Sequence, residues 1–213
     1  MRKTKALLQI YQKMFEALGP RQWWPGETPF EVVIGAILTQ NTNWSNVEKA
    51  IKNLKTAGKL SPEGIYALSV TELAKLIRPS GFFNVKAKRV KAFINWLFSR
   101  YEGNLSKMLD QDLQTLRGEL LSVKGIGPET ADSILLYAGN KPTFVVDAYT
   151  HRIFSRHELI PEESTYDDMK SFFEENLPKD VQLFNEYHAL LVNIGKMFCK
   201  PKKVCEPCPL KDI

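Results

Sequence analysis

The sequence predicts an all-α protein, and three observations carry this prediction. Apolar residues recur at the i, i+3 and i+4 spacing of a helix through most of the chain. Strict apolar–polar alternation is scarce, and residues 143–146, Thr-Phe-Val-Val, are the only good β-branched run. The 12 glycines and 12 prolines fall mostly between the helical patterns. We therefore expect about ten helices joined by short loops.

The helical patterns follow one another with recognisable ends. The first, residues 4–18, ends at a Gly-Pro pair, which commonly stops a helix. Residues 30–38 are apolar nearly all round, which predicts a buried central helix. Ser61, followed by proline, and Thr71, followed by glutamate, predict capped helix starts. The other helices are expected at residues 46–57, 61–66, 71–77, 85–101, 110–122, 130–139, 148–157, 166–176 and 184–198.

Composition and charge limit the class of protein. The chain has 213 residues, of which 44% are apolar and 25% charged, so it can bury a core and is not mainly disordered. The net charge of +5 permits a polyanionic partner without requiring one. No apolar run approaches the roughly 18 residues of a membrane span, and the N-terminal apolar stretch is too short and mixed for a signal peptide. We expect a soluble, cytoplasmic protein with no membrane partner.

A turn that contains two glycines stands between two helical patterns and comprises Lys124, Gly125, Ile126 and Gly127. Glycines at this spacing let the backbone turn sharply and expose N–H groups at a helix N-terminus, where a phosphate oxygen binds whatever the base. Ile126 is expected to enter the core and fix the turn. A simple helical corner is the alternative. The full pattern, with small residues in the following helix, resembles a helix-hairpin-helix motif, so we predict that these four residues contact DNA.

A carboxylate follows the apolar run 143–146, because Asp147 stands at the start of the helix expected at 148–157. An aspartate in this place is typically an N-cap. The helix N-terminus would hold the carboxylate rigidly and keep it ionised, so a capping role and a chemical role are compatible.

These motifs occur in an order that resembles the helix-hairpin-helix DNA glycosylases of the endonuclease III superfamily. Two further segments match: residues 30–42, Phe-Glu-Val-Val-Ile-Gly-Ala-Ile-Leu-Thr-Gln-Asn-Thr, and residues 80–87, Ser-Gly-Phe-Phe-Asn-Val-Lys-Ala. The resemblance therefore runs over nearly the whole chain. It implies two helical domains with a DNA-binding cleft between them, one at residues 25–136 with the hairpin and one at 1–24 plus 137–213.

The resemblance also implies the reaction. A damaged nucleotide leaves the duplex stack and its N-glycosidic bond is cut. Asp147 matches the catalytic aspartate, which would stabilise the oxocarbenium-like sugar and orient or deprotonate the nucleophile. Members with added lyase activity carry a lysine two residues after the second hairpin glycine, where this chain has Glu129. A carboxylate cannot form a Schiff base, so we predict a monofunctional enzyme that uses water.

Three tryptophans predict the substrate class. Trp23, Trp24 and Trp44 lie in or beside links, and their placement resembles the aromatic pocket of the 3-methyladenine glycosylase branch. An indole face attracts a cationic alkylated purine by about 0.5–2 kcal/mol. Core packing is the alternative for all three.

Other polar residues are expected to touch DNA. Gln40 and Asn41 stand where the resemblance places a side chain into the gap left by the flipped base, although they could equally cap a helix end. A basic cluster is expected either to contact phosphates or to form a solvated helix face. Its members are Lys86, Lys88, Arg89 and Lys91.

All the cysteines lie near the end of the sequence, at Cys199, Cys205 and Cys208. Such clustering favours a metal or cluster site over disulfides. The superfamily resemblance implies a [4Fe–4S] centre in a structural and DNA-docking role, helped by the loop lysines Lys200, Lys202 and Lys203. By the superfamily spacing the fourth ligand would be residue 214, so it is absent from this chain. Zinc is the alternative, with His188 as fourth ligand.

The leading prediction is a monofunctional glycosylase that removes alkylated purines from double-stranded DNA as a nucleoid-associated monomer. A glycosylase for oxidised or mismatched bases and a non-catalytic DNA-binding protein are the alternatives. Packing or polar contacts are expected for the three histidines, His151, His157 and His188.

Overall fold

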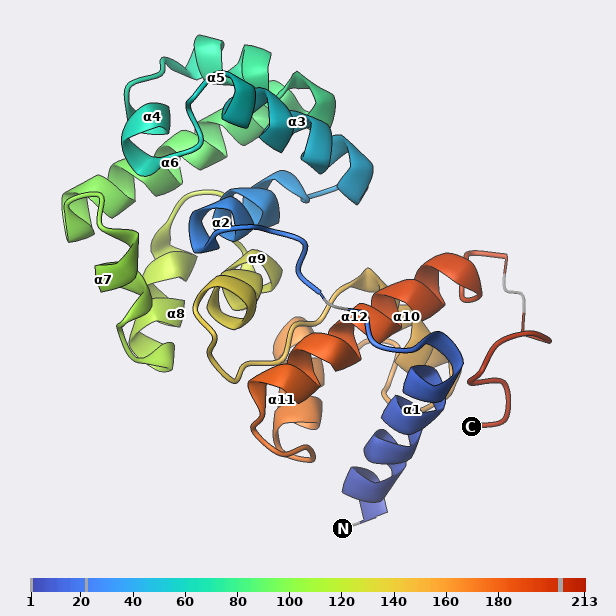
Figure 1. The fold of residues 1–213 in the computed structure, drawn as a ribbon. Helices are drawn as coiled ribbons and strands as arrows, with labels where there is room; N and C mark the ends of the chain where they lie inside the picture. Colours follow the sequence, from blue (N-terminus) through green and yellow to red (C-terminus); the bar gives the residue numbers. More distant parts are fainter. Residues whose placement is uncertain (1, 22, 203–204) are drawn as a thin grey trace. The chain divides into compact units, whose positions relative to one another are not determined.

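A computed structural model describes residues 2–21, 23–202 and 205–213 and confirms the all-α prediction (Figure 1). No strand occurs among these residues, and none of their helices is long and apolar enough to cross a membrane. The helices are α1 (Arg2–Leu18), α2 (Pro29–Leu38), α3 (Trp44–Thr56), α4 (Pro62–Tyr66), α5 (Val70–Leu76), η1 (Arg78–Ser80), α6 (Phe83–Tyr101), α7 (Leu105–Leu109), α8 (Leu113–Ser122), α9 (Pro128–Ser133), η2 (Ile134–Ala138), α10 (Ala148–Arg156), α11 (Tyr166–Glu174) and α12 (Val181–Met197).

Contacts between α-carbons divide the chain into two compact units. The terminal unit comprises residues 1–24 and 142–213 and holds α1, α10, α11 and α12. The central unit comprises residues 25–141 and holds α2 to α9 with η1 and η2. The expected boundary after residue 136 falls inside η2, a π-helix that continues α9 and belongs wholly to the central unit.

Helix α2 forms the centre of the central unit. All of its residues from Phe30 to Leu38 are buried, as the sequence predicts for a helix that is apolar all round. It contacts α3, α6, α9 and η2. The helix begins after Thr28, whose side chain accepts a hydrogen bond from the backbone N of Glu31 at 3.2 Å. Each large apolar side chain buried here stabilises the unit by about 1.5–3 kcal/mol.

Aromatic side chains form the core of the terminal unit. The rings of Phe144 and Phe173 stack with their centroids 3.9 Å apart, and Phe184 and Tyr187 pack edge-on against Phe144. The Tyr187 hydroxyl donates a hydrogen bond to the Leu7 carbonyl at 3.0 Å, which ties α12 to α1.

The β-branched run 143–146 is buried and not helical, and it pairs with no strand in the described part of the chain. A side chain of α11 takes the place of a strand partner. Glu174 Oε1 accepts hydrogen bonds from the Phe144 backbone N at 2.8 Å and from Thr143 Oγ1 at 3.1 Å. The backbone N–H of Phe144 is therefore satisfied without a sheet.

The predicted helices begin and end within three residues of the observed ones, and capping explains the difference at two starts. The helix expected over residues 110–122 starts later, because Asp112 caps α8 by accepting bonds from the backbone N of Gln114 and Thr115. The short helix α7 precedes it and was not expected. Helix α5 is capped by Ser69 and not by Thr71, because Ser69 and Glu72 bond reciprocally as a capping box.

Candidate functional site

Asp147 lies at the N-terminus of α10, directly after the buried segment 143–146. Its Oδ1 accepts hydrogen bonds from the Thr150 backbone N at 2.7 Å and from Thr150 Oγ1 at 3.0 Å. The predicted N-cap is therefore confirmed. These bonds fix one carboxylate oxygen, and the N-terminus of the helix favours its negative charge.

The other oxygen of Asp147 faces a histidine on α12. Oδ2 lies 3.5 Å from Nε2 of His188, and the two side chains are only 11% and 6% exposed. Burial of Asp147 acts to raise its pKa, but hydrogen bonding to His188, the charge of His188 and the bonds from Thr150 together hold the pKa below its usual value. The carboxylate is therefore ionised at neutral pH.

Close packing of α10 and α12 creates this pair. At Gly195 on α12, an added Cβ would lie 2.2 Å from Cδ1 of Tyr149 on α10. Only glycine lets the two helices approach this closely at that point. The same approach brings His188 within reach of Asp147.

The hairpin joins α8 to α9 in the central unit. Gly125 has a φ of +94°, which favours glycine, whereas Gly127 is the N-cap of α9 with a φ of −95°. Ile126 is 5% exposed, as the sequence predicts, and Lys124 is exposed. The Ile126 backbone N donates to the Val123 carbonyl at 3.0 Å, which closes the turn.

A buried ion pair holds the two helices of the hairpin together. Arg117 on α8 donates from Nε to Oδ1 of Asp132 at 2.9 Å and from its terminal nitrogen to Oδ2 at 3.2 Å. The Asp132 side chain is fully buried on α9. This two-point contact fixes the angle at which the turn is presented.

Gln40 and Asn41 follow α2 and differ in their surroundings. Asn41 is exposed and has a φ of 53°. Gln40 is half-buried, and its Nε2 donates to the Gly125 carbonyl at 3.0 Å and to Thr130 Oγ1 at 2.9 Å. The residue that caps α2 at its C-terminus is Thr39.

The tryptophans fall in different units. Trp23 and Trp24 lie in the terminal unit with ring centroids 5.4 Å apart, and the Lys196 ammonium lies 6.0 Å from the Trp23 centroid. Trp44 begins α3 in the central unit, where its Nε1 donates to Glu48 Oε1 at 2.8 Å. Trp44 also lines a pocket of about 260 Å³ with charged side chains of α2 and α3.

The cysteine loop follows α12. Cys199 and Cys208 are half-buried and Cys205 is exposed. Burial raises the pKa of Cys208, and the neighbouring Cys199 and Cys205 add to the rise, so the three thiols lie close enough to interact. Across residues 2–21, 23–202 and 205–213, however, no three histidine, cysteine or carboxylate groups gather as they do around a metal. His188 contacts Asp147, and it does not gather with two of the cysteines within the described residues as the zinc alternative requires.

Two arginines of α10 hold the start of this loop. Arg152 Nε donates to the Cys199 carbonyl at 2.6 Å. Arg156 donates to Cys199 Sγ at 3.3 Å, to the Lys200 carbonyl at 2.7 Å and to the Pro201 carbonyl at 3.1 Å. Lys203, one of the lysines expected to dock on DNA, lies outside the described residues.

Comparison with known proteins identifies the family. A model of the HhH-GPD superfamily of base excision DNA repair proteins matches residues 34–179. The chain belongs to this superfamily. MJ1434 of Methanocaldococcus jannaschii, whose name describes it provisionally as a DNA repair glycosylase, is 50% identical to this chain over 212 residues. The aligned residues cover 99% of this chain and 96% of MJ1434. Endonuclease III of Thermotoga maritima is 31% identical over 185 residues, which cover 86% of this chain and 81% of that enzyme.

Solved structures agree with this HhH-GPD assignment. The 3-methyladenine DNA glycosylase MagIII of Helicobacter pylori, bound to 1,N6-ethenoadenine, has a TM-score of 0.75 and 31% identity over 91% of this chain and 95% of that one. A non-covalent complex of endonuclease III with DNA has a TM-score of 0.82 at 22% identity, over 97% of this chain and 92% of that one, and shows the shared fold.

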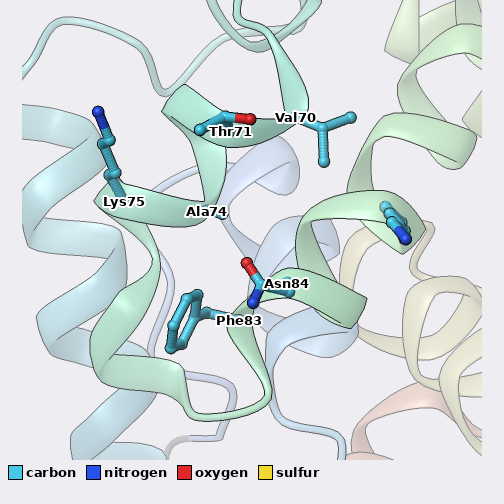
Figure 2. A pocket seen from close by; sticks show the side chains of 7 residues that line it. Val70, Thr71, Ala74, Lys75, Phe83 and Asn84 are labelled. Atoms are coloured by element: carbon cyan, nitrogen blue, oxygen red, sulfur yellow. The ribbon is translucent and has the colours of Figure 1, made fainter.

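The basic cluster of this HhH-GPD protein does not form one surface. Lys86 is buried, Arg89 contacts Gln40, and Lys91 donates to the Tyr66 carbonyl at 2.8 Å. Lys88 lines a different feature, a pocket of about 500 Å³ between α5 and α6. Figure 2 shows this pocket, with Val70, Ala74 and Phe83 among its labelled side chains. A single phosphate-binding face built from all four basic residues is therefore excluded.

Burial of Lys86 has a structural consequence. Its Nζ donates to the Leu38 carbonyl at 2.8 Å and to the Ser80 carbonyl at 2.6 Å, and burial, with the nearby charge of Arg89, lowers its pKa to about 8. We expect Lys86→Met to lower the free energy of unfolding by about 2–4 kcal/mol, because two buried carbonyls lose their donor. Lys88→Met on the same helix is the control and should change it by less than about 0.5 kcal/mol. Urea unfolding measures both, and equal losses would contradict the expectation.

Sequence reasoning missed the contact made by His188 and the contacts made by Gln40 and Arg89. Packing or polar contacts were expected for His188, and the polar contact proves to be with Asp147. A helical apolar pattern around His188 indicates burial but not its partner on another helix. Arg89 was grouped with the neighbouring basic residues. The spacing of basic residues in the sequence does not show whether a side chain binds phosphate or forms a hydrogen bond inside the protein.

Proposed function

We propose that this HhH-GPD protein is a monofunctional DNA glycosylase that hydrolyses the N-glycosidic bond of an alkylated purine of the 3-methyladenine type. The single observation that carries the reaction is Asp147. Its carboxylate is largely buried, anchored at one oxygen by Thr150 and kept ionised by His188. A negative charge held in place without reorganisation is suited to stabilise a developing cationic sugar.

In the proposed reaction the target nucleotide leaves the duplex stack, as in other enzymes that act on a base. The bond between C1′ and the base nitrogen breaks, and its electron pair leaves with the base. The Asp147 carboxylate stabilises the oxocarbenium-like sugar, and a water oxygen then bonds to C1′. Asp147 accepts the proton released by that water and passes it to solvent or to the departed base.

Glu129 supports hydrolysis by water alone. It lies in the first turn of α9 and is exposed, two residues after Gly127. A lyase reaction needs an amine at this place to form a Schiff base with the sugar. Since a carboxylate cannot do so, we expect an abasic site as the product.

The likeness to MagIII supports the alkylpurine, because that enzyme shares 31% of its residues with this chain and its name specifies 3-methyladenine. The Trp23–Trp24 pair supplies electron-rich ring faces of the kind that attract a cationic base. A second candidate is an oxidised or mismatched base, which the 31% identity to endonuclease III of Thermotoga maritima favours. Asp147 would serve either substrate.

We also propose that Cys199, Cys205 and Cys208 ligate a [4Fe–4S] cluster with a structural and DNA-docking role. Three thiols suit iron–sulfur chemistry, although the described residues do not form a complete four-ligand site. Iron, acid-labile sulfide and zinc contents of the purified protein distinguish the cluster from zinc.

The test uses duplex DNA treated with a methylating agent. Chromatography identifies the released bases, and strand cleavage is measured with and without alkali. We expect free 3-methyladenine and nicks only after alkali. If no alkylpurine is released from the methylated duplex, but a base is released from duplexes that carry an oxidised or mismatched base, the second candidate is favoured. A borohydride-trapped protein–DNA adduct would contradict the monofunctional mechanism.

A further inference from the structure

The Gln40 side chain reaches from the end of α2 to the hairpin. Both hydrogens of its amide nitrogen are used, one on the Gly125 carbonyl and one on Thr130 Oγ1. Gly125 is the left-handed residue of the turn, and Thr130 lies in the first turns of α9. One amide thus bonds to both the turn and the helix that follows it.

Arg89 on α6 completes this arrangement. Its terminal nitrogen donates to Gln40 Oε1, which orients the amide so that the nitrogen faces the hairpin. The aliphatic part of the same side chain lies directly against the turn, because a Cβ added at Gly125 would be 2.4 Å from Arg89 Cγ. Gly125 is therefore required both by its positive φ and by the approach of Arg89.

From these contacts we propose that Gln40, oriented by Arg89, is a positioning residue for the DNA-binding turn at Gly125, Ile126 and Gly127. The two helices of the hairpin are tied by Arg117 on α8 and Asp132 on α9, whereas Gln40 bonds to the turn itself. The inference rests on the proposed DNA-binding role of the hairpin. In this proposal Gln40 positions the turn in the free protein, before any base is flipped.

A role in positioning differs from a role in filling the gap left by a flipped base. A gap-filling side chain acts mainly on damaged DNA, because a damaged nucleotide is the one that is most easily extruded. A residue that positions the turn affects every duplex, since phosphate contacts are independent of sequence and damage. It also affects the free protein, where gap filling has no consequence.

Hydrogen exchange and DNA affinity test the proposal in Gln40→Met, Arg89→Met and the double variant. The reporter is the Ile126 amide, which closes the turn by donating to Val123. We expect its exchange to accelerate at least about five-fold in each single variant, the effect of about one lost hydrogen bond, while α6 amides keep their rates. The affinity for undamaged duplex should fall by a similar factor at fixed salt. In the double variant, the exchange rate of the Ile126 amide and the loss of DNA affinity should be no larger than in either single variant, because both residues act through one contact.

Asn53→Leu is the matched control, because the Asn53 amide also donates to a carbonyl of the same unit, that of Leu76 at 2.9 Å. It should leave the Ile126 amide unchanged. Unchanged Ile126 exchange in Gln40→Met, or additive effects in the double variant, would overturn the proposal. Faster exchange with unaltered affinity for DNA would uphold the restraint on the turn and contradict the proposed DNA role of the hairpin.

Discussion

The Asp147→Asn variant is expected to excise its target base about 1,000-fold more slowly than the wild-type protein in single turnover, with little change in affinity for duplex DNA. Asparagine is as good an N-cap as aspartate, so the bond from the Thr150 backbone N and the start of α10 are retained. The negative charge is lost, and with it the attraction between this side chain and His188. The loss of rate therefore measures the electrostatic contribution of the carboxylate.

Asp180→Asn is the matched control for this experiment. Asp180 caps α12 in the same unit and accepts a hydrogen bond from the Leu183 backbone N at 2.7 Å. Its replacement should leave excision within about two-fold of wild type, because an asparagine cap is equivalent. A rate that survives Asp147→Asn, or an equal loss in both variants, would show that Asp147 has no chemical role.

The His188→Leu variant is expected to slow excision by about ten-fold at neutral pH, the effect of about 1.4 kcal/mol, and to move the acid limb of the pH–rate profile upward. Burial acts to raise the pKa of Asp147, and His188 and Thr150 are the residues that bring it below its usual value. Without His188 the effect of burial is opposed by Thr150 alone. The carboxyl group then protonates at a higher pH, and the active ionised form is lost sooner on acidification.

The lowered pKa of Asp147 also predicts how the free energy of unfolding depends on pH. A carboxyl group whose pKa is lowered on folding contributes stability above its ordinary pKa of about 3.9, and that stability disappears as the pH falls through the folded value. His188→Leu should therefore reduce the difference in unfolding free energy between neutral and acidic pH. Rate profiles from about pH 3 to 9 and urea unfolding at both ends of that range measure the two effects.

His151→Leu serves as the control for His188. His151 is on the same helix as Asp147, but its ring contacts the Glu162 carbonyl at 2.8 Å. We expect it to leave the acid limb unmoved. If the rate falls in His188→Leu but the acid limb of the pH–rate profile does not move, His188 contributes packing and does not set the pKa of Asp147.

Most helices of this protein could be predicted from the sequence because their signals are local. Residues 30–38 are apolar nearly all round, which predicted α2 as a buried helix. The hydrogen bond from the Gly64 backbone N to Ser61 Oγ at 2.9 Å confirms the predicted cap of α4. Helices α4 and α7 both have five residues, too few for a periodic pattern, and α7 was missed because it lacks the proline that marks the start of α4. Thr71 was mistaken for a cap because Ser69 and Thr71 both precede the helical run, and only the reciprocal bond with Glu72 decides between them.

The sequence by itself determined which residues have the right chemistry and local geometry: Asp147 as a capping carboxylate, Gly125 as the left-handed residue of the turn, and the buried Ile126. The tertiary structure alone decided their partners. His188 reaches Asp147 because α10 and α12 pack closely, and Gln40 reaches Gly125 because α2, α6 and the hairpin share one core. Such contacts join residues far apart in the chain, so no local periodicity encodes them, and they form only when whole helices bury their apolar faces together.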